Sequence, residues 1–224
     1  MVTGLRKSGA SPASATAFFL GNPALNPAVL VFIALTPGLG PQWALLRLGL
    51  AIVLVFGTAA LVSRLSKDTV TQVHTIHQAS EDGSAPAPGG PLALRWLKSL
   101  LTLTISLVPE YVLMILALGA VRVFLFPKAG PELGNGILVI LGLALAGTLF
   151  AIPTAGEIPI IQTMRGFGMG AGPAGALLLT LAPVSLPSLI MVSRVFHKRV
   201  LLAIGLAVLA TGILGGLIAA ALAL

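Results

Sequence analysis

The sequence predicts an all-α protein, a polytopic transmembrane helix bundle with two internal repeats that contain proline-broken helices. Composition supports this first: of 224 residues, 57% are hydrophobic and 8% are charged, and the mean hydropathy is +1.05. Roughly a quarter of the residues in a soluble domain are charged, so this chain cannot cover a normal water-exposed surface. Few aromatic and many small residues favour closely packed helices over a β-barrel.

The second observation is the length of the apolar runs, because a helix needs about 20 apolar residues to cross a bilayer. Suitable runs lie at residues 12–36, 41–63, 98–126, 134–151, 172–193 and 200–224. The interval between the second and third runs is rich in Ser, Gly, Pro and charges, which predicts a solvated loop. We therefore divide the chain into a first repeat (1–63), a polar loop (64–97), two connecting spans (98–151) and a second repeat (152–224).

The third observation is a repeated Pro-x-x-x-Pro motif inside apolar sequence. LGNPALNPAVLVF contains Pro23 and Pro27, and TLAPVSLPSLIMV contains Pro183 and Pro187, 160 positions later. Small-residue segments precede both motifs, and similar apolar spans follow both. The matching segments are 9–14 with 170–175, 20–32 with 180–192, and 48–54 with 204–210. This common order indicates a duplicated unit.

Charge predicts the orientation of the repeats, since Lys and Arg mark cytoplasmic loops. We interpret the net charge of +7 in this way rather than as a nucleic-acid surface. Four basic residues of the 64–98 segment make this loop cytoplasmic. The count leaves out Arg47, which lies inside the second span. If the repeats are parallel, seven basic residues lie inside the cell and five outside. If residues 152–168 add a crossing, the repeats become inverted, and nine basic residues lie inside and three outside. The count favours inverted repeats.

Broken helices at matching positions of a duplicated unit predict a binding site near the midplane, at the repeat interface. Non-helical backbone at membrane depth needs protein or a watery cavity around it. Polar side chains flank both breaks, and the expected site combines residues 20–28, 152–160 and 182–189. Its candidate residues are Asn22, Pro23, Asn26, Pro27, Thr154, Glu157, Pro183, Ser185, Pro187 and Ser188. The alternative is that these prolines are ordinary kinks, and that Asn and Ser only cap freed backbone groups.

Glu157 lies between Pro153 and Pro159, next to an apolar run. A carboxylate at membrane depth costs about 2.5 kcal/mol or more, so it is expected to face a cavity or a partner. It could bind a coupling proton, a cation or a cationic substrate, or it could be an interfacial residue that caps a short helix and pairs with Arg165. Glu110, within the third span, is a secondary candidate for the site.

The sequence lacks the residues for a disulfide, a metal site, a nucleotide site or an enzyme active site. The chain has no cysteine, so a disulfide or thiolate metal site is excluded. His74 and His77 lack a third metal ligand, and GAGPAG does not follow a strand, so no metal, cofactor or nucleotide is predicted. An intramembrane enzyme would need a nucleophile and a base, but His197 lies in a charged segment at a span end, which disfavours it. Gly212 and Gly216 predict a helix-packing face.

GASPASATAFFLGNPALNPAVLVF and IPTAGEIPIIQTMRGFGMGAGPAGALLLTLAPVSLPSLIMV resemble the two signature regions of the bacterial predicted-permease family that includes the ArsP-type organoarsenical efflux permeases. The resemblance covers most of the chain outside residues 64–96. It implies a multi-pass permease of the bacterial inner membrane that moves a small solute or ion by alternating access. Members that handle trivalent arsenicals carry cysteines beside the proline motif. Here the stretch from Pro153 to Pro159 has none, so an oxygen-based site suits a harder or organic substrate.

The segment before the second motif has no counterpart before the first, whereas the family is usually longer. Three readings follow: a shortened member, one subunit of a split transporter, or a half that completes its cavity by forming a homo-oligomer. The leading functional hypothesis is a secondary transporter. The alternative is a non-transporting membrane scaffold, or a subunit of a larger transporter, whose broken helices only pack.

Overall fold

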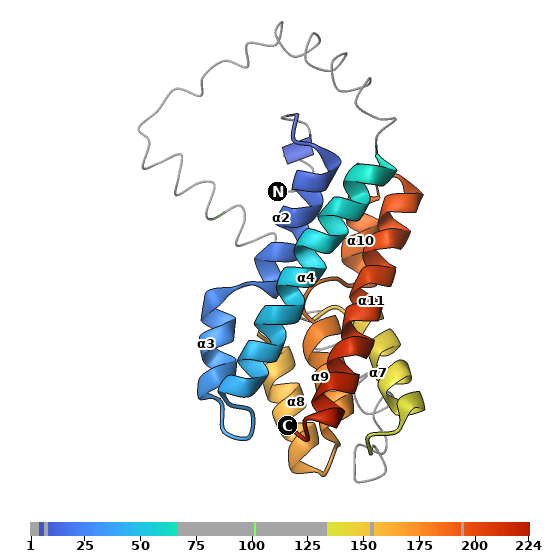
Figure 1. Ribbon diagram of the computed structural model, residues 1–224. Helices are drawn as coiled ribbons and strands as arrows, with labels where there is room; N and C mark the ends of the chain where they lie inside the picture. The colour runs from blue at the N-terminus through green and yellow to red at the C-terminus, as the bar shows by residue number, and fades with distance from the viewer. Residues whose placement is uncertain (1–4, 7–8, 67–100, 102–133, 153–154, 194) are drawn as a thin grey trace, which may run out of the picture. The chain divides into compact units, whose positions relative to one another are not determined.

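The protein is described by a computed structural model. It describes residues 5–6, 9–66, 101, 134–152, 155–193 and 195–224. The chain divides into two compact units, Met1–Val70 with Lys128–Leu224, and Thr71–Pro127. All structural statements below concern the first unit. Its described elements are all helical (Figure 1), as the sequence predicts. Most of the predicted loop 64–97, the predicted span 98–126 and Glu110 lie outside the described residues.

The first half of the unit contains three helices that each start at a proline, namely α2 (Pro12–Ala24), α3 (Pro27–Leu35) and α4 (Pro41–Leu65). Proline suits the first helical position, where its missing N–H is not needed and its φ angle is already helical. Between α2 and α3, the side chain of Asn26 accepts a hydrogen bond from the Ala28 N–H at 3.0 Å and caps α3. Pro27 therefore starts a new helix as well as ending the previous one.

The second half contains five helices in the described residues. They are α7 (Ile137–Leu149), α8 (Glu157–Gly166), α9 (Ala171–Thr180), α10 (Leu186–Val192) and α11 (Lys198–Ala221). At 1.5 Å per residue, α7 and α8 are about 20 Å and about 15 Å long. Both are shorter than the roughly 30 Å hydrocarbon core of a bilayer. The run predicted as a full span at 134–151 is thus only 13 helical residues.

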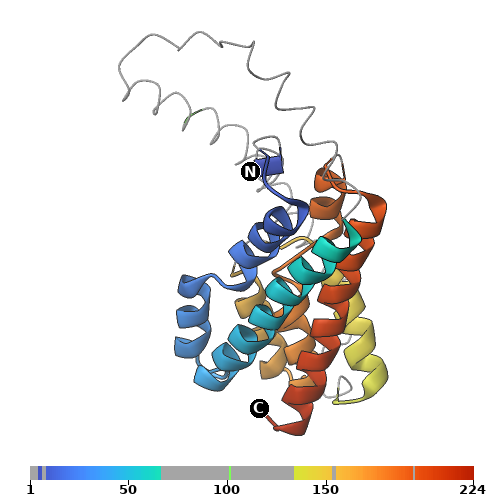
Figure 2. The same ribbon diagram turned by 45° about the horizontal axis from the view of Figure 1, so that its top comes forward.

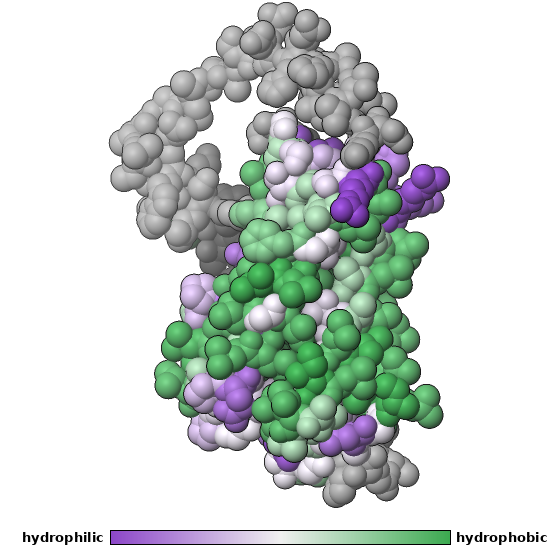
Figure 3. Space-filling model, in the orientation of Figure 1, coloured by the Kyte–Doolittle hydropathy of each residue, from purple (hydrophilic) through white to green (hydrophobic). Residues whose placement is uncertain are grey.

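Among the described residues, three helical stretches are long and apolar enough to cross a membrane: Pro12–Leu35, which includes the break between α2 and α3, Pro41–Leu65 and Lys198–Ala221. Large apolar side chains cover their outer faces, and Leu35 and Leu202 are 76% and 64% exposed. Figure 3 shows this apolar surface on the face in view, with polar residues towards its two ends. Such an exposed apolar surface is expected where lipid, rather than water, surrounds the protein. The unit is therefore a membrane helix bundle, as predicted.

Helix α9 lies at the centre of this bundle. All ten of its residues are buried, and it contacts α4, α7, α8 and α11. Figures 1 and 2 show it behind the adjacent pair α4 and α11. A Cβ on Gly212 of α11 would collide with Thr180, and a Cβ on Gly216 would lie 2.6 Å from Ile140. The predicted packing face at Gly212 and Gly216 is confirmed, because small residues allow such close helix contacts.

Side-chain contacts fix the direction of each long helix. Pairs of neighbouring residues show that α4 is antiparallel to α2 and to α11, and that α9 is also antiparallel to α11. For α2 and α4 these pairs are Gly21 with Val55 and Pro23 with Arg47. For α4 and α11 they are Leu50 with Gly215 and Leu65 with Val200, which line one groove, and for α9 and α11 they are Gly172 with Gly216 and Thr180 with Gly212. The broken helix α2–α3 and the broken helix α9–α10 consequently run in opposite directions (Figure 1).

The α7–α8 segment forms a hairpin beside the central helix. The side chain of Asn135, just before α7, accepts a hydrogen bond from the Gly172 N–H at 2.8 Å. The start of α7 therefore lies beside the start of α9, which follows directly after the end of α8. The chain enters and leaves this hairpin at the same end of the bundle, with residues 150–152 and 155–156 at its tip.

Candidate functional site

The carbonyl groups of Pro23 and Ala24 lack their helical donors at the break between α2 and α3. In a continuous helix, the Pro23 carbonyl would accept from the N–H of residue 27, but Pro27 has none. The Ala24 carbonyl would accept from the Ala28 N–H, which is bound to Asn26 instead. Both carbonyls accept hydrogen bonds from Arg47 of α4, at 3.0 Å from Nη2 to Pro23 and 3.4 Å from Nε to Ala24. One guanidinium therefore binds both of these carbonyls.

The third nitrogen of Arg47 forms an ion pair with Glu157. Nη1 lies 2.5 Å from Oε1, and the two side chains are 2% and 1% exposed. Glu157 occupies the first turn of α8, where the positive end of the helix dipole also stabilises a carboxylate. A lone buried charge would be costly at this depth. Arg47 and Glu157 therefore each stabilise the charge of the other.

The second carboxylate oxygen of Glu157 is free. Oε2 is buried and has no hydrogen-bond partner among the described residues. Glu157 is also the single acidic side chain in the described part of the chain, since the other five lie between residues 68 and 132. The pair is neutral as a whole, yet Oε2 can still accept a proton, a cation or a hydrogen-bond donor. The sequence predicts that Glu157 faces a cavity or a partner. In the structure Arg47 is the partner, and Oε2 has no hydrogen-bond donor among the described residues.

The break between α9 and α10 is satisfied by its own residues. The Ser185 N–H donates to Ser188 Oγ at 2.9 Å, and the Ser188 N–H donates to Ser185 Oγ at 3.4 Å. This reciprocal pair is a capping box, which satisfies two free N–H groups at the start of α10. Val184 belongs to the same buried hydrophobic cluster as Leu20 and Ala24 beside the first break. A common core therefore connects the two breaks, although their polar groups have different partners.

The remaining predicted residues take varied positions. Asn22 and Pro27 are exposed on the first broken helix, and on the second Pro183 is buried whereas Pro187 is exposed. Thr154 lies outside the described residues. The structure thus brings together the Pro23 carbonyl and Glu157, with Arg47 between them, while Ser185 and Ser188 bind one another.

The alternative interpretation, in which Glu157 pairs with Arg165, is wrong. Arg165 Nη1 donates to the backbone oxygen of Leu224 at 2.9 Å, and its guanidinium lies 5.0 Å from the centre of the Trp43 ring. It stands in the last turn of α8, whereas Glu157 stands in the first. Sequence reasoning missed Arg47, the actual partner. A basic residue inside an otherwise apolar span was the signal, because an intramembrane charge implies a partner of opposite sign.

The fold and this site define a class: a polytopic helical membrane protein with broken helices and a buried ion pair. The chain belongs to the predicted-permease family, whose pattern it matches over residues 1–221. It is similar to UPF0718 protein YraQ of Escherichia coli (strain K12), with 42% identity over 216 residues, 96% of this chain and 60% of that protein. It is also similar to UPF0718 protein MJ0584 of Methanocaldococcus jannaschii, with 32% identity over 123 residues, 54% of this chain and 34% of that protein.

The family assignment confirms that the two proline-containing regions of the sequence are those of a predicted permease. The chain spans less than two thirds of the length of these relatives. No solved structure matches the fold.

Proposed function

We propose that the protein is a permease that moves a small solute or ion through a site between the two broken helices. The Arg47–Glu157 pair at the first break carries this proposal. A purely structural pair would be expected to use all of its polar atoms, because unpartnered buried groups cost about 1–3 kcal/mol. Glu157 Oε2 is instead left open beside backbone that has left the helix.

In this proposal Glu157 is the coupling group. Protonation of the carboxylate removes the charge that holds Arg47, and cation binding at Oε2 competes with Arg47 for the same group. Either event weakens the hydrogen bonds from Arg47 to the Pro23 and Ala24 carbonyls, so α3 can move relative to α2. An ion or proton that binds one arrangement better than the other shifts the population between them, which is the requirement for coupled transport.

Inverted repeats complete the proposal. The opposite directions of α2–α3 and α9–α10 support an inverted pair, and the α7–α8 hairpin gives the change of orientation without a further full crossing. Arg6, Lys198 and Arg199 border one groove at a single end of the bundle, in agreement with the nine-to-three distribution of basic residues. By the positive-inside rule this end, with the loop 64–97, is cytoplasmic in a bacterial inner membrane.

Transport is tested by an accumulation screen in an efflux-deficient bacterial host with arsenicals, metal ions and small organic toxicants. We expect the wild type to lower the accumulation of at least one compound, and Glu157→Gln to abolish this effect. Arg64→Gln, an exposed residue of the last turn of α4, is the control and should behave as the wild type. Equal transport by Glu157→Gln and wild type would exclude the coupling role. Failure of the reconstituted protein to take up any candidate solute, with residues 22–27 and 183–188 inaccessible to water, would exclude the permease.

A non-transporting scaffold or subunit is the second candidate. The observation that favours it is the second break, where Ser185 and Ser188 satisfy each other and need no ligand. Under this alternative Glu157→Gln leaves function intact, whereas a bulky residue at Gly212 disrupts it by separating α9 from α11. The two variants therefore distinguish the candidates in one experiment.

A further inference from the structure

A groove separate from the Arg47–Glu157 pair opens at the end of the bundle where α2 and α11 begin and α4 ends. Its volume is about 680 Å³, within the range of small-molecule pockets, about 300–1,000 Å³. We call it the basic groove. It is lined by Arg6, Pro12, Leu65, Ser66, Val195, Phe196, His197, Lys198, Arg199 and Val200.

The basic groove has cationic groups but no balancing acid among the described residues that line it. Arg6 and Arg199 are permanently charged, and the single acidic side chain of the described residues is already paired with Arg47. Arg6 Nη1 donates to the Ala10 carbonyl at 2.7 Å, while the buried Nε has no partner within the described residues. Burial also lowers the pKa of Arg6, because the partly desolvated guanidinium loses hydration. These charges favour an anionic occupant.

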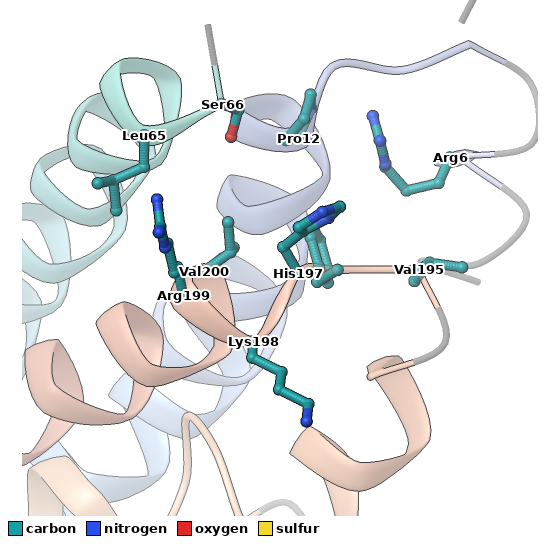
Figure 4. Close-up of a pocket in the computed structure, with 10 residues that line it drawn as sticks. Arg6, Pro12, Leu65, Ser66, Val195, His197, Lys198, Arg199 and Val200 are labelled. Carbon is teal, nitrogen blue, oxygen red and sulfur yellow. The ribbon is translucent and has the colours of Figure 1, made fainter. Parts of the chain in front are cut away.

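The start of α11 adds to this preference. His197 is the N-cap residue of this 24-residue helix, and no described side chain caps its first N–H groups. Free N–H groups and the helix dipole favour an anion at such an end. Figure 4 shows Arg199 extending towards Leu65 and Ser66 and His197 towards Pro12, whereas Lys198 points to the opposite side. Arg6 and Arg199 are therefore the cations to test.

We propose that the basic groove binds the phosphate headgroup of an anionic phospholipid. Besides its cations, the groove is lined by apolar side chains, Leu65, Val195, Phe196 and Val200, which suit the first carbons of acyl chains. It also lies at the ends of three helices that are long and apolar enough to cross a membrane, where headgroups are found. Basic pockets between transmembrane helices bind anionic headgroups in this way. The site does not depend on transport through the bundle.

The full chain is purified in an uncharged detergent, and native mass spectrometry measures the binding of phosphatidylglycerol and of phosphatidylcholine. We expect phosphatidylglycerol to remain bound preferentially and to be lost as salt rises. Each cation near an anionic headgroup raises the affinity for the lipid roughly fivefold. The double variant Arg6→Gln/Arg199→Gln should therefore lower this affinity by about 25-fold. Arg64→Gln removes the same charge near the same end of the bundle, but Arg64 does not line the groove, so binding should be unchanged.

Three results would overturn the proposal. Equal binding of phosphatidylcholine would show an apolar rather than an anionic site, and displacement by millimolar inorganic phosphate would assign the groove to a free anion. If the double variant is unstable in detergent, Arg199→Lys and Arg199→Gln are compared singly, and equal loss of lipid in both would contradict a charge-based site.

Discussion

The two proline breaks have similar sequences but are held in different ways. The break between α2 and α3 depends on two distant segments, because Arg47 of α4 binds its carbonyls and Glu157 of α8 balances the charge of Arg47. The break between α9 and α10 depends on Ser185 and Ser188, which lie within the break itself. Two similar proline motifs are therefore stabilised differently, one by long-range contacts and one by local hydrogen bonds.

This difference indicates which break can respond to a ligand. The local capping box contains no ionisable group, so a proton or an ion has little effect on it. The Arg47–Glu157 pair contains a titratable carboxylate with one free oxygen, so the first break can be controlled chemically. We infer that the first broken helix is the responsive one and the second is a fixed support.

The largest expected effect is at Arg47. Arg47→Met leaves Glu157 as a buried unpaired charge and removes the donors of two carbonyls, which should lower the free energy of unfolding by about 3–5 kcal/mol. Thermal unfolding in detergent measures this, with Arg64→Met as the exposed control on the same helix. Arg47→Met/Glu157→Met should recover part of the stability but no transport, since apolar replacement of both charges removes the unpaired ion. No recovery in the double variant would show that the two residues do not act as a pair.

The next effect is at the glycine contact between α9 and α11. Gly212→Leu places a side chain against Thr180 and Ala176, in a region where every residue of α9 is buried. Overpacking of this kind costs about 1–3 kcal/mol. Gly57→Leu on α4 has open space around its Cβ position and should unfold at the wild-type temperature. Equal melting temperatures for the two variants would mean that the close contact is absent in the membrane.

The smallest effect compares two asparagines near the first break. Asn26 caps α3 by accepting from the Ala28 and Val29 N–H groups, so Asn26→Ala should cost about 1 kcal/mol. Asn22 is exposed on α2, and Asn22→Ala should change stability by about 0.5 kcal/mol or less. Chemical or thermal unfolding measures both. If Asn22→Ala loses more stability than Asn26→Ala, Asn22 makes a contact that this fold does not contain.

Much of the fold was predictable from the sequence because a bilayer imposes simple rules. Apolar length located the three long membrane-crossing stretches, and the paired prolines located both breaks to within a few residues. Run length misjudged α7, because an apolar stretch of about 20 residues can equally form half of a hairpin. Only the packing of α7 and α8 against α9 shows that the chain returns to the same end of the bundle.

The candidate site was predictable only in part. Glu157 could be selected from its depth and its prolines, and the first break from Pro23 and Pro27. Its partner could not be chosen in the same way, because Arg165 is near in sequence whereas Arg47 is 110 positions away. Pairing over that distance depends on how α4 and α8 pack. The same applies to Ser185 and Ser188, whose residue types suit a ligand site and a capping box equally well.

The central claim, that the Arg47–Glu157 pair holds the first break closed, is tested most directly by cysteine labelling. The natural chain has no cysteine, so single cysteines can be added at the half-buried Leu25 of the first break and Leu189 beside the second. The rate at which each cysteine reacts with a water-soluble maleimide in membranes measures how often its break opens to water. We predict that Glu157→Gln accelerates labelling of Leu25→Cys by about tenfold, the effect of roughly 1.4 kcal/mol on local opening, and leaves Leu189→Cys unchanged. Equal rates at Leu25→Cys with and without Glu157→Gln, or equal acceleration at both positions, would contradict the claim.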